Sequence, residues 1–198
     1  GPDWSLHPDY LARWNAFRNT HASVLTPTKI LAFYMADEPT WNGISANDLK
    51  TATDTVAANY PSIPRIVVEA YPKVSEIIVP ASMSWVAFDK YAVKDPGTDP
   101  TYQSLYNTLK SRRFSTNQKM FIIGDAWWAE GLHGANGIPI TDTAGVALNY
   151  YNFAKSDPDI TALIGFLWAS FTEGVGTRDL PASTVATYKL IGESITGK

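Results

Sequence analysis

The sequence of 198 residues contains no cysteine, which excludes disulfides, thiolate metal sites and cysteine nucleophiles. It has no surplus of basic residues, because 16 Lys and Arg stand against 19 Asp and Glu for a net charge of -3. No apolar run approaches the roughly 20 residues that cross a bilayer. We therefore expect no nucleic-acid partner and no membrane partner.

Aromatic residues, in contrast, are abundant. The chain has 7 Trp, 10 Tyr and 8 Phe, whereas charged residues make up 18%, below the roughly 25% of an average soluble domain. A hydrophobic fraction of 45% with 13 Gly and 13 Pro indicates a folded core with many turns. Core packing explains part of the aromatic content. A surplus of Trp and Tyr is also typical of clefts that stack on sugar rings.

Short apolar runs recur along the chain, at residues 30–35, 63–70, 84–88, 120–124 and 162–168. None alternates cleanly between apolar and polar residues, which predicts strands buried on both faces, as in parallel sheets. Amphipathic periodicity and capping signals predict helices at 7–25, 45–61, 102–114, 144–155 and 183–195. The segment after Tyr71 has room for at most a turn or two of helix.

The alternation of strand, loop and helix predicts right-handed βαβ units and a parallel sheet. An open doubly wound sheet needs a Gly-rich turn after its first strand, but this chain has Asp37-Glu38-Pro39-Thr40-Trp41 there. Polar and aromatic residues instead follow every strand, where barrel enzymes build their sites. The sequence therefore favours an α/β fold of the (β/α)8 TIM-barrel type, as a single domain over residues 1–198.

The barrel is incomplete by count, since a full one has about 250 residues and eight strands. The simplest interpretation is that this chain supplies the fourth to eighth barrel strands, preceded by one helix. Such a sheet would have two unpaired edges, which favour association. We expect a homo-oligomer, a missing N-terminal half of the barrel supplied from elsewhere, or loops that cover the edges.

Carboxylates follow the first and fourth predicted strands. Asp37 and Glu38 precede Pro39, and Asp125 precedes Ala126-Trp127-Trp128. A carboxylate at the end of a buried strand is costly unless the site uses it. Further chemistry-bearing residues at strand ends or in the loops beyond them are Glu69, Tyr71, Asp89, Tyr91, Glu130, His133, Trp168 and Glu173.

These motifs resemble the large clan of retaining glycoside hydrolases with (β/α)8 barrels, the cellulase and β-galactosidase type, over residues 30–171. In that clan, a Glu in an Asn-Glu-Pro motif is the general acid/base, a Glu after strand seven is the nucleophile, and a Trp on strand eight floors a sugar subsite. The resemblance implies Glu38 as the acid/base, Asp125 as the second carboxylate and Trp168 as the subsite floor. Substrate contacts are expected from Asp37, Trp41, Glu69, Tyr71, Asp89, Tyr91, Trp127, Trp128, His133 and Trp168.

Two positions depart from the family pattern. Asp37 stands where the family has Asn, and Asp125 is shorter than Glu by about 1.5 Å, so both retaining and inverting outcomes stay open. These departures also leave open a barrel that binds carbohydrate with weak or no catalysis. The Asp37-Glu38 pair is similar to that of substrate-assisted hexosaminidases, a further alternative. A lyase or aldolase would need a strand-end Lys, and Lys90 alternates away from its neighbours.

The function implied is hydrolysis of a β-linked glycan by two carboxylates, with the pKa of Glu38 raised by burial against aromatic residues. No cofactor or metal is expected, because the three His residues are scattered without metal-ligand spacing. No nucleophile-elbow pattern is present either. The composition suits a secreted enzyme with an oligo- or polysaccharide substrate.

Overall fold

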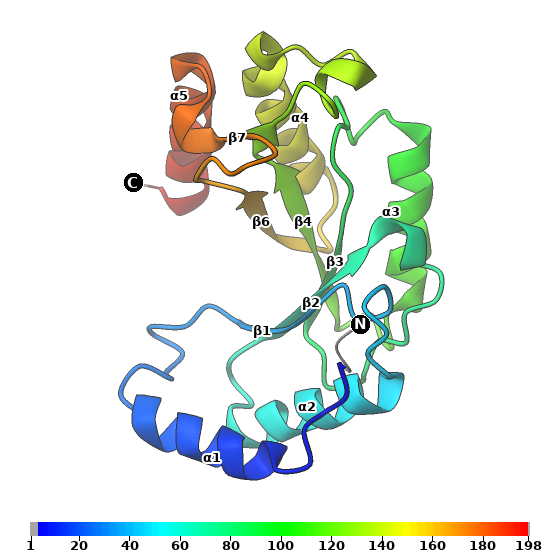
Figure 1. The fold of residues 1–198 in the computed structure, drawn as a ribbon, viewed down its shortest axis with the longest axis vertical. Coiled ribbons are helices and arrows are strands. Elements are labelled where there is room, and N and C mark those ends of the chain that lie inside the picture. The colour runs from blue at the N-terminus through cyan, green and yellow to red at the C-terminus, as the bar shows by residue number, and fades with distance from the viewer. Residues whose placement is uncertain (1–3, 198) are drawn as a thin grey trace. The chain divides into compact units, whose positions relative to one another are not determined.

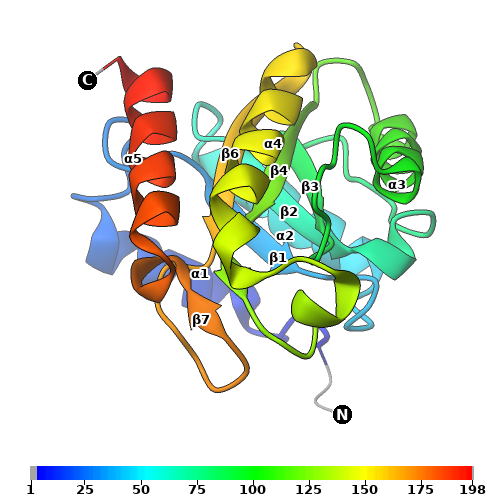
Figure 2. The same ribbon diagram turned by 90° about the horizontal axis from the view of Figure 1, so that it is seen from above.

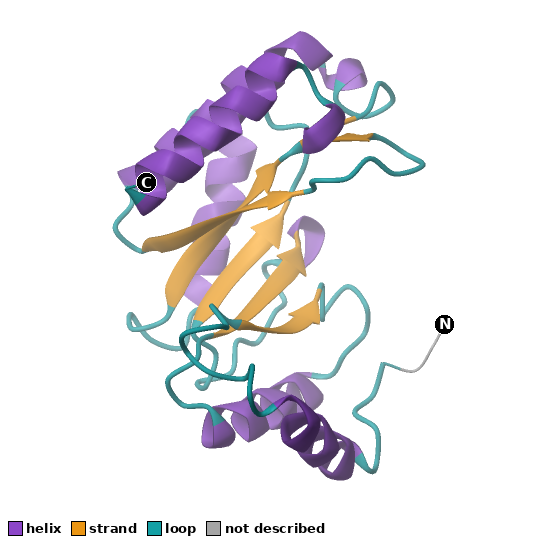
Figure 3. Ribbon diagram, turned by 90° about the vertical axis from the view of Figure 1, so that its left-hand side faces the viewer, coloured by secondary structure: helices purple, strands orange, loops and turns teal. Residues whose placement is uncertain are grey.

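The computed structural model describes residues 4–197. Within them, five strands form a sheet in the order β1-β2-β3-β4-β6, and two short strands, β5 and β7, pair with each other. Helices and strands alternate along the chain (Figures 1 and 3). The chain divides into two compact units: residues up to Phe88 with Thr108–Lys119, and Asp89–Asn107 with the residues from Met120 onward.

In the first unit, α1 (Tyr10–His21) and α2 (Ala46–Asn59) lie on the same side of β1 (Phe33–Asp37) and β2 (Arg65–Ala70) (Figure 1). The predicted start of α2 is confirmed, because the Ser45 Oγ accepts the Asp48 N–H at 3.0 Å, a typical helix cap. Helix α1 is shorter than predicted. The N–H groups of Val24 and Leu25 turn back to the His21 carbonyl, which ends the helix there.

Strands β1 and β2 pair in parallel, with Tyr34 opposite Ile66, Ala36 opposite Val67 and a register shift between Tyr34 and Ala36. Such an irregularity turns the residues beyond it relative to the partner strand. Strand β2 continues into a short 3-10 helix, Tyr71–Lys73, which confirms the short helical segment expected after Tyr71. The unit also contains most of β3 (Trp85–Asp89), whose central residues are buried.

The second unit contains β4 (Lys119–Asp125) from Met120 onward, α4 (Thr143–Ser156), β6 (Ile160–Phe166) and α5 (Ala182–Thr196). Strand β4 pairs with β6 in parallel, with Asp125 opposite Phe166. Helix α4 packs against both β6 and α5 (Figure 2). Helix α3 (Pro100–Arg112) contributes its first half to this unit. Short 3-10 helices lie at Gly134–Asn136, Ile140–Asp142 and Thr177–Asp179.

Part of the aromatic content packs the core of the second unit. Tyr102 and Tyr106 of α3 meet Phe153 of α4 edge-on, with ring centroids 5.8 and 5.1 Å apart. Tyr102 also meets Tyr150 edge-on at 5.9 Å. These side chains are almost fully buried, and edge-to-face pairs are favourable beyond the area that they bury.

The antiparallel pair of β5 (Trp127–Trp128) and β7 (Val175–Gly176) was not expected from the sequence. In its register, Trp127 lies opposite Gly176 and Trp128 opposite Val175. This pairing brings the backbone at Gly174 close to the Trp127 ring. A Cβ at Gly174 would lie 2.5 Å from the Trp127 ring, so this position requires glycine. A strand of two residues leaves no periodicity in a sequence.

The expected burial of all strands on both faces is confirmed for β2, β3 and β4, and it is wrong for β1 and β6. Among the described residues, β1 and β6 end the sheet, with one strand neighbour each. Tyr34 in β1 is exposed, as are Ile164 and Phe166 in β6. An end strand has one side that no neighbour covers, which the local sequence cannot reveal.

We predict that the free side of β6 promotes association. Ile164→Lys places a charge on this strand, where Ile164 is 36% exposed, and charges on edge strands block strand pairing. The weight-average mass in sedimentation is expected to fall toward that of a single chain. Leu148→Lys, at an exposed position of α4, is the control. An unchanged mass for Ile164→Lys would exclude this edge as the interface.

Candidate active site

In the first unit, the carboxyl end of β1 carries the first candidate carboxylates. Glu38 follows the strand with φ of 45°, a left-handed conformation that costs roughly 1–2 kcal/mol for a residue other than glycine. Its N–H donates to the Val68 carbonyl at 2.7 Å. Its neighbour Asp37 is exposed and accepts the Tyr34 hydroxyl at 2.5 Å. Strain of this kind gathers at functional sites, which supports Glu38 as a candidate.

Glu69, at the end of β2, is fully buried and holds the turn that follows Glu38. One carboxylate oxygen accepts the Thr40 N–H at 2.9 Å, and the other accepts the N–H groups of Trp41 at 3.3 Å and Ala70 at 2.9 Å. The expected contact of Glu69 with substrate stays a prediction, and in the structure its carboxylate is occupied by the backbone. Both oxygens face backbone donors, so we infer that Glu69 positions the loop beside Glu38.

We predict that Glu69→Ala destabilises the protein by at least about 2 kcal/mol, because it leaves buried N–H groups without an acceptor. Urea denaturation measures this change. The control is Glu76→Ala, since the exposed Glu76 pairs with Lys73 along the same segment. A loss no larger than that of the control would show that the turn after Glu38 does not depend on Glu69.

Two aromatic residues lie near these carboxylates in the chain and are solvent-accessible. Trp41 is 56% exposed in the turn held by Glu69, and Tyr71 is exposed directly after β2. Since β1 and β2 are paired, the structure brings Asp37, Glu38, Trp41 and Tyr71 to the same end of two neighbouring strands. Exposed aromatic faces beside a carboxylate can stack on a sugar ring.

In the second unit, Asp125 at the end of β4 is 4% exposed. The His133 Nε2 lies 2.9 and 3.1 Å from its two carboxylate oxygens. The Ala92 N–H donates to Oδ2 at 2.7 Å, and Ala92 has a left-handed φ of 56°. Asp125 therefore anchors the segment after β3. Its carboxylate is buried, whereas a nucleophile must be accessible to the substrate.

Burial raises the pKa of the Asp125 carboxyl above its ordinary value, and the hydrogen bonds from His133, Ala92 and Val93 oppose this rise. The folded state consequently binds this proton more tightly than the unfolded state. A raised pKa means that the stabilisation is present at low pH and is lost as the pH rises through the folded-state value.

We predict that the unfolding free energy of the protein, relative to that of Asp125→Asn, falls as the pH rises from about 3.8. The asparagine carries no ionisable proton, so the difference isolates this carboxyl. Each tenfold difference in proton affinity between the two states corresponds to about 1.4 kcal/mol. Denaturant melts over a pH series measure it. A difference that stays flat or rises with pH would contradict the assignment.

Aromatic rings connect the predicted residues of the second unit. The Tyr91 hydroxyl lies 3.5 Å from the Asp89 carboxylate, and the Tyr91 ring meets Trp127 edge-on at 5.6 Å. Trp127 meets His133 edge-on at 5.0 Å. The structure thus brings Asp89, Tyr91, Asp125, Trp127 and His133 into one cluster.

The two adjacent tryptophans have different surroundings. Trp127 is buried, and its indole N–H has no acceptor within residues 4–197. Trp128 is partly exposed and donates to the Ile138 carbonyl at 2.8 Å. Together with Glu130 and Ile140 it lines a cavity of about 360 Å³.

Phe166 and Phe171 were missed by the sequence interpretation. Phe166 is 43% exposed and packs against Tyr91 at 5.6 Å. Phe171 is also exposed and contacts Trp127 at 5.0 Å. Trp168, the expected subsite floor, is 59% exposed and lies beyond the end of β6 rather than within it. The sequence offered one signal for these two residues, which is that Phe166 lies at the end of a strand.

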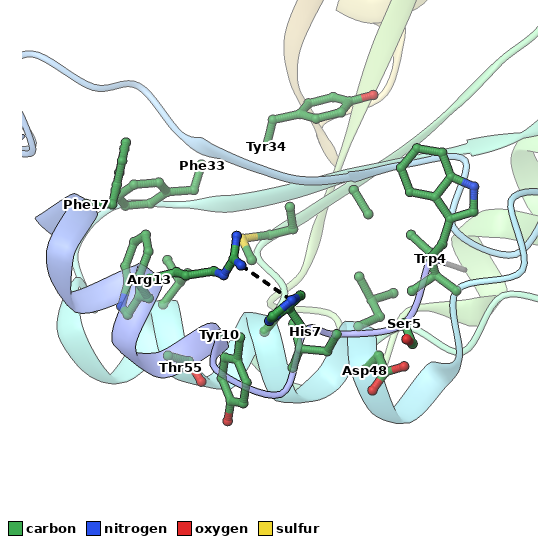
Figure 4. A pocket seen from close by; sticks show the side chains of 18 residues that line it. Trp4, Ser5, His7, Tyr10, Arg13, Phe17, Phe33, Tyr34, Asp48 and Thr55 are labelled. Carbon is green, nitrogen blue, oxygen red and sulfur yellow. Dashed lines mark hydrogen bonds between the residues drawn. The ribbon is translucent and has the colours of Figure 1, made fainter. Parts of the chain in front are cut away.

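A larger cavity, of about 590 Å³, lies elsewhere in the first unit, between α1, β1 and α2. His7 and Arg13 face into it from the α1 segment, with 3.4 Å between Arg13 Nη2 and His7 Nε2 (Figure 4), and Tyr34 of β1 is also among the residues that line it. Its walls are mainly apolar, and neither Glu38 nor Glu69 lines it. Size alone therefore does not identify it as the catalytic site.

Within the described part of the chain, no group of three or more His, Asp or Glu side chains is arranged to hold a metal ion. The helices of residues 4–197 also include none that is both long and apolar enough for a membrane span.

The fold class predicted from the sequence is confirmed: the described residues form an α/β structure of the (β/α)8-barrel type with five strand–helix units. The chain is similar to the crystal structure of a glycoside hydrolase family 17 β-1,3-glucanosyltransferase from Rhizomucor miehei, with a TM-score of 0.63 and 14% identity over 91% of this chain and 73% of that chain. It is also similar to an active-site mutant of R. miehei β-1,3-glucanosyltransferase in complex with laminaritriose, with a TM-score of 0.61, 15% identity and the same coverage of 91% and 73%.

No protein-family model matches the chain, and no curated protein matches it. At 14–15% identity, the likeness establishes the fold alone, whereas function depends on the site itself.

Proposed function

We propose that this protein is a glycoside hydrolase that acts on a β-linked glycan, with Glu38 as the general acid. The observation that carries this proposal is the strained, left-handed backbone of Glu38 at the end of β1, followed by a turn held by the buried Glu69. This turn fixes the backbone from which the Glu38 carboxyl projects. Preorganised groups of this kind are what general acid catalysis requires.

The second carboxylate in this proposal is Asp125, with Glu130 and Glu173 as the alternatives. Asp125 ends a strand, as Glu38 does, but it is buried. Glu130 and Glu173 lie in loops and are exposed. The distance between the two carboxyl groups decides the stereochemical outcome, about 5–5.5 Å for retention and about 6.5–9.5 Å for inversion.

The proposed substrate is a β-glucan oligosaccharide. Exposed Trp41, Tyr71 and Trp168 offer aromatic faces for sugar rings. The structural neighbours carry the name β-1,3-glucanosyltransferase, and one was solved with laminaritriose, so β-1,3-linked glucans are the first substrates to test. A secreted location remains a prediction from composition.

The experiment is product analysis by chromatography after incubation with laminari-oligosaccharides, cello-oligosaccharides and N-acetylglucosamine oligomers. Shorter or longer oligosaccharides are expected from at least one β-glucan series, through hydrolysis or transfer. Glu38→Gln, checked for native melting behaviour, serves as the inactive reference. Absence of products from every series at high protein concentration would reject the hydrolase proposal.

A second candidate, glycan binding without turnover, is favoured by one observation. The Asp125 carboxylate has donors at both oxygens and little exposure, which suits a structural anchor. Isothermal titration with the same oligosaccharides separates the two functions. Measurable binding with no products would support the binding module.

A further inference from the structure

We propose that His133 is the positioning residue for Asp125: it donates a hydrogen bond from its Nε2–H to the carboxylate, and thereby holds Asp125 oriented and favours its ionised form. This inference deepens the proposed function and rests on it for the part that concerns catalysis. It replaces the expectation that His133 contacts substrate, because the side chain is 2% exposed.

The hydrogen bonds of the imidazole determine its tautomer. The Ala129 N–H donates to Nδ1 at 3.0 Å, and a backbone amide can only donate, so Nδ1 must be the unprotonated acceptor. In a neutral imidazole the proton then resides on Nε2, which faces both Asp125 oxygens at 2.9 and 3.1 Å. The ring is therefore a donor toward Asp125 and has no nitrogen left for a substrate.

The ring itself is fixed by its own loop. The His133 N–H donates to the Ala129 carbonyl at 2.7 Å, so Ala129 contacts His133 through both of its backbone groups. Trp127 packs edge-on against the imidazole with centroids 5.0 Å apart. Because Ala129 holds Nδ1 and Trp127 packs against the ring, the direction of the Nε2–H is fixed, and with it the rotamer of Asp125.

Tyr102 on α3, Tyr150 on α4 and Tyr188 on α5 interact electrostatically with this carboxylate. Asp89 belongs to the same cluster through the Tyr91 hydroxyl. Burial raises the pKa of Tyr102, Tyr150 and Tyr188 above the ordinary value of 10.0, so they stay neutral. The hydrogen bonds from His133, Ala92 and Val93 are consequently what favours the ionised form.

Two substitutions separate the two bonds of the ring. His133→Gln places an amide nitrogen near the position of Nε2 and keeps a donor for Asp125. His133→Asn places an amide oxygen near the position of Nδ1 and keeps the acceptor for Ala129, but it loses the donor. We expect the acidic limb of the pH–kcat profile to move up by about one pH unit or more in His133→Asn. Its kcat should fall about tenfold to a hundredfold, with KM little changed.

His133→Gln should retain most of the wild-type profile, and His21→Gln on exposed α1 is the control. A role in folding alone would lower the melting temperature of both variants and leave the acidic limb in place, which would overturn the proposal.

Nitrogen NMR of the wild-type protein tests the tautomer independently of turnover. A protonated Nε2 with an unprotonated Nδ1 is expected, and the opposite tautomer would also overturn the inference. Carbon NMR of the Asp125 carboxyl in His133→Asn should show titration at higher pH than in the wild type. If the protein turns over no glycan, these two spectra still decide the inference, so its failure and that of the proposed function are distinguishable.

Discussion

Glu38→Gln is expected to lower the turnover of saccharide leaving groups by about 10²- to 10⁴-fold, the usual contribution of a general acid. Glutamine keeps the size and hydrogen-bonding capacity of the side chain but cannot protonate the departing oxygen. Dinitrophenyl glycosides need no such proton, so their cleavage should be much less affected. Steady-state rates on the two substrate types measure this difference.

The matched control is Glu76→Gln, an exposed glutamate of the same unit that pairs with Lys73. Because Glu38 is half-buried and its backbone is strained, the melting temperature of each variant must accompany the rates. If Glu38→Gln turns over ordinary glycosides within a few-fold of the wild type, the acid assignment fails and the binding function takes precedence.

For Asp125, we expect Asp125→Ala to slow all substrates alike, by roughly 10³-fold or more, if this carboxylate is the nucleophile or stabilises the charge of the transition state. With a β-glycoside of a good leaving group, added azide should occupy the space of the lost carboxylate. In a retaining enzyme the azide attacks the anomeric carbon as the leaving group departs, and the α-glycosyl azide forms.

The product anomer is read by proton NMR. Asp142→Asn, at a partly exposed aspartate of the same unit that pairs with Lys94, is the control. The same assay on Glu130→Gln and Glu173→Gln identifies which carboxylate acts. If Asp125→Ala loses stability but keeps its rate per folded molecule, Asp125 is only an anchor for the segment at Ala92.

The family resemblance predicted the positions of Asp125 and Trp168 in the chain, but it did not predict that Asp125 is buried and Trp168 exposed. The motif placed both residues near strand ends, and both are there. The motif did not reveal that His133, eight positions along the chain, turns back onto Asp125. A loop of that length has many possible paths, and packing of Trp127 against His133 and Phe171 selects one.

Local chemistry in the sequence was sufficient to predict the elements. The Ser45 cap, the apolar runs and the alternation of strands with helices determined an α/β chain of the barrel type, because hydrophobic periodicity and capping act over a few residues. The same reasoning placed Glu38 and Asp125 at strand ends, since the carboxyl ends of parallel strands carry the loops that form sites.

Only the tertiary structure decided what each side chain does there. Glu69 and Asp125 are both acidic residues at strand ends, and the sequence analysis expected Glu69 to contact substrate. The fold instead buries both against backbone N–H groups of distant segments, Thr40 and Trp41 for Glu69 and Ala92 for Asp125. Burial and hydrogen-bond partners depend on residues about 30 positions away, and no local pattern encodes such contacts.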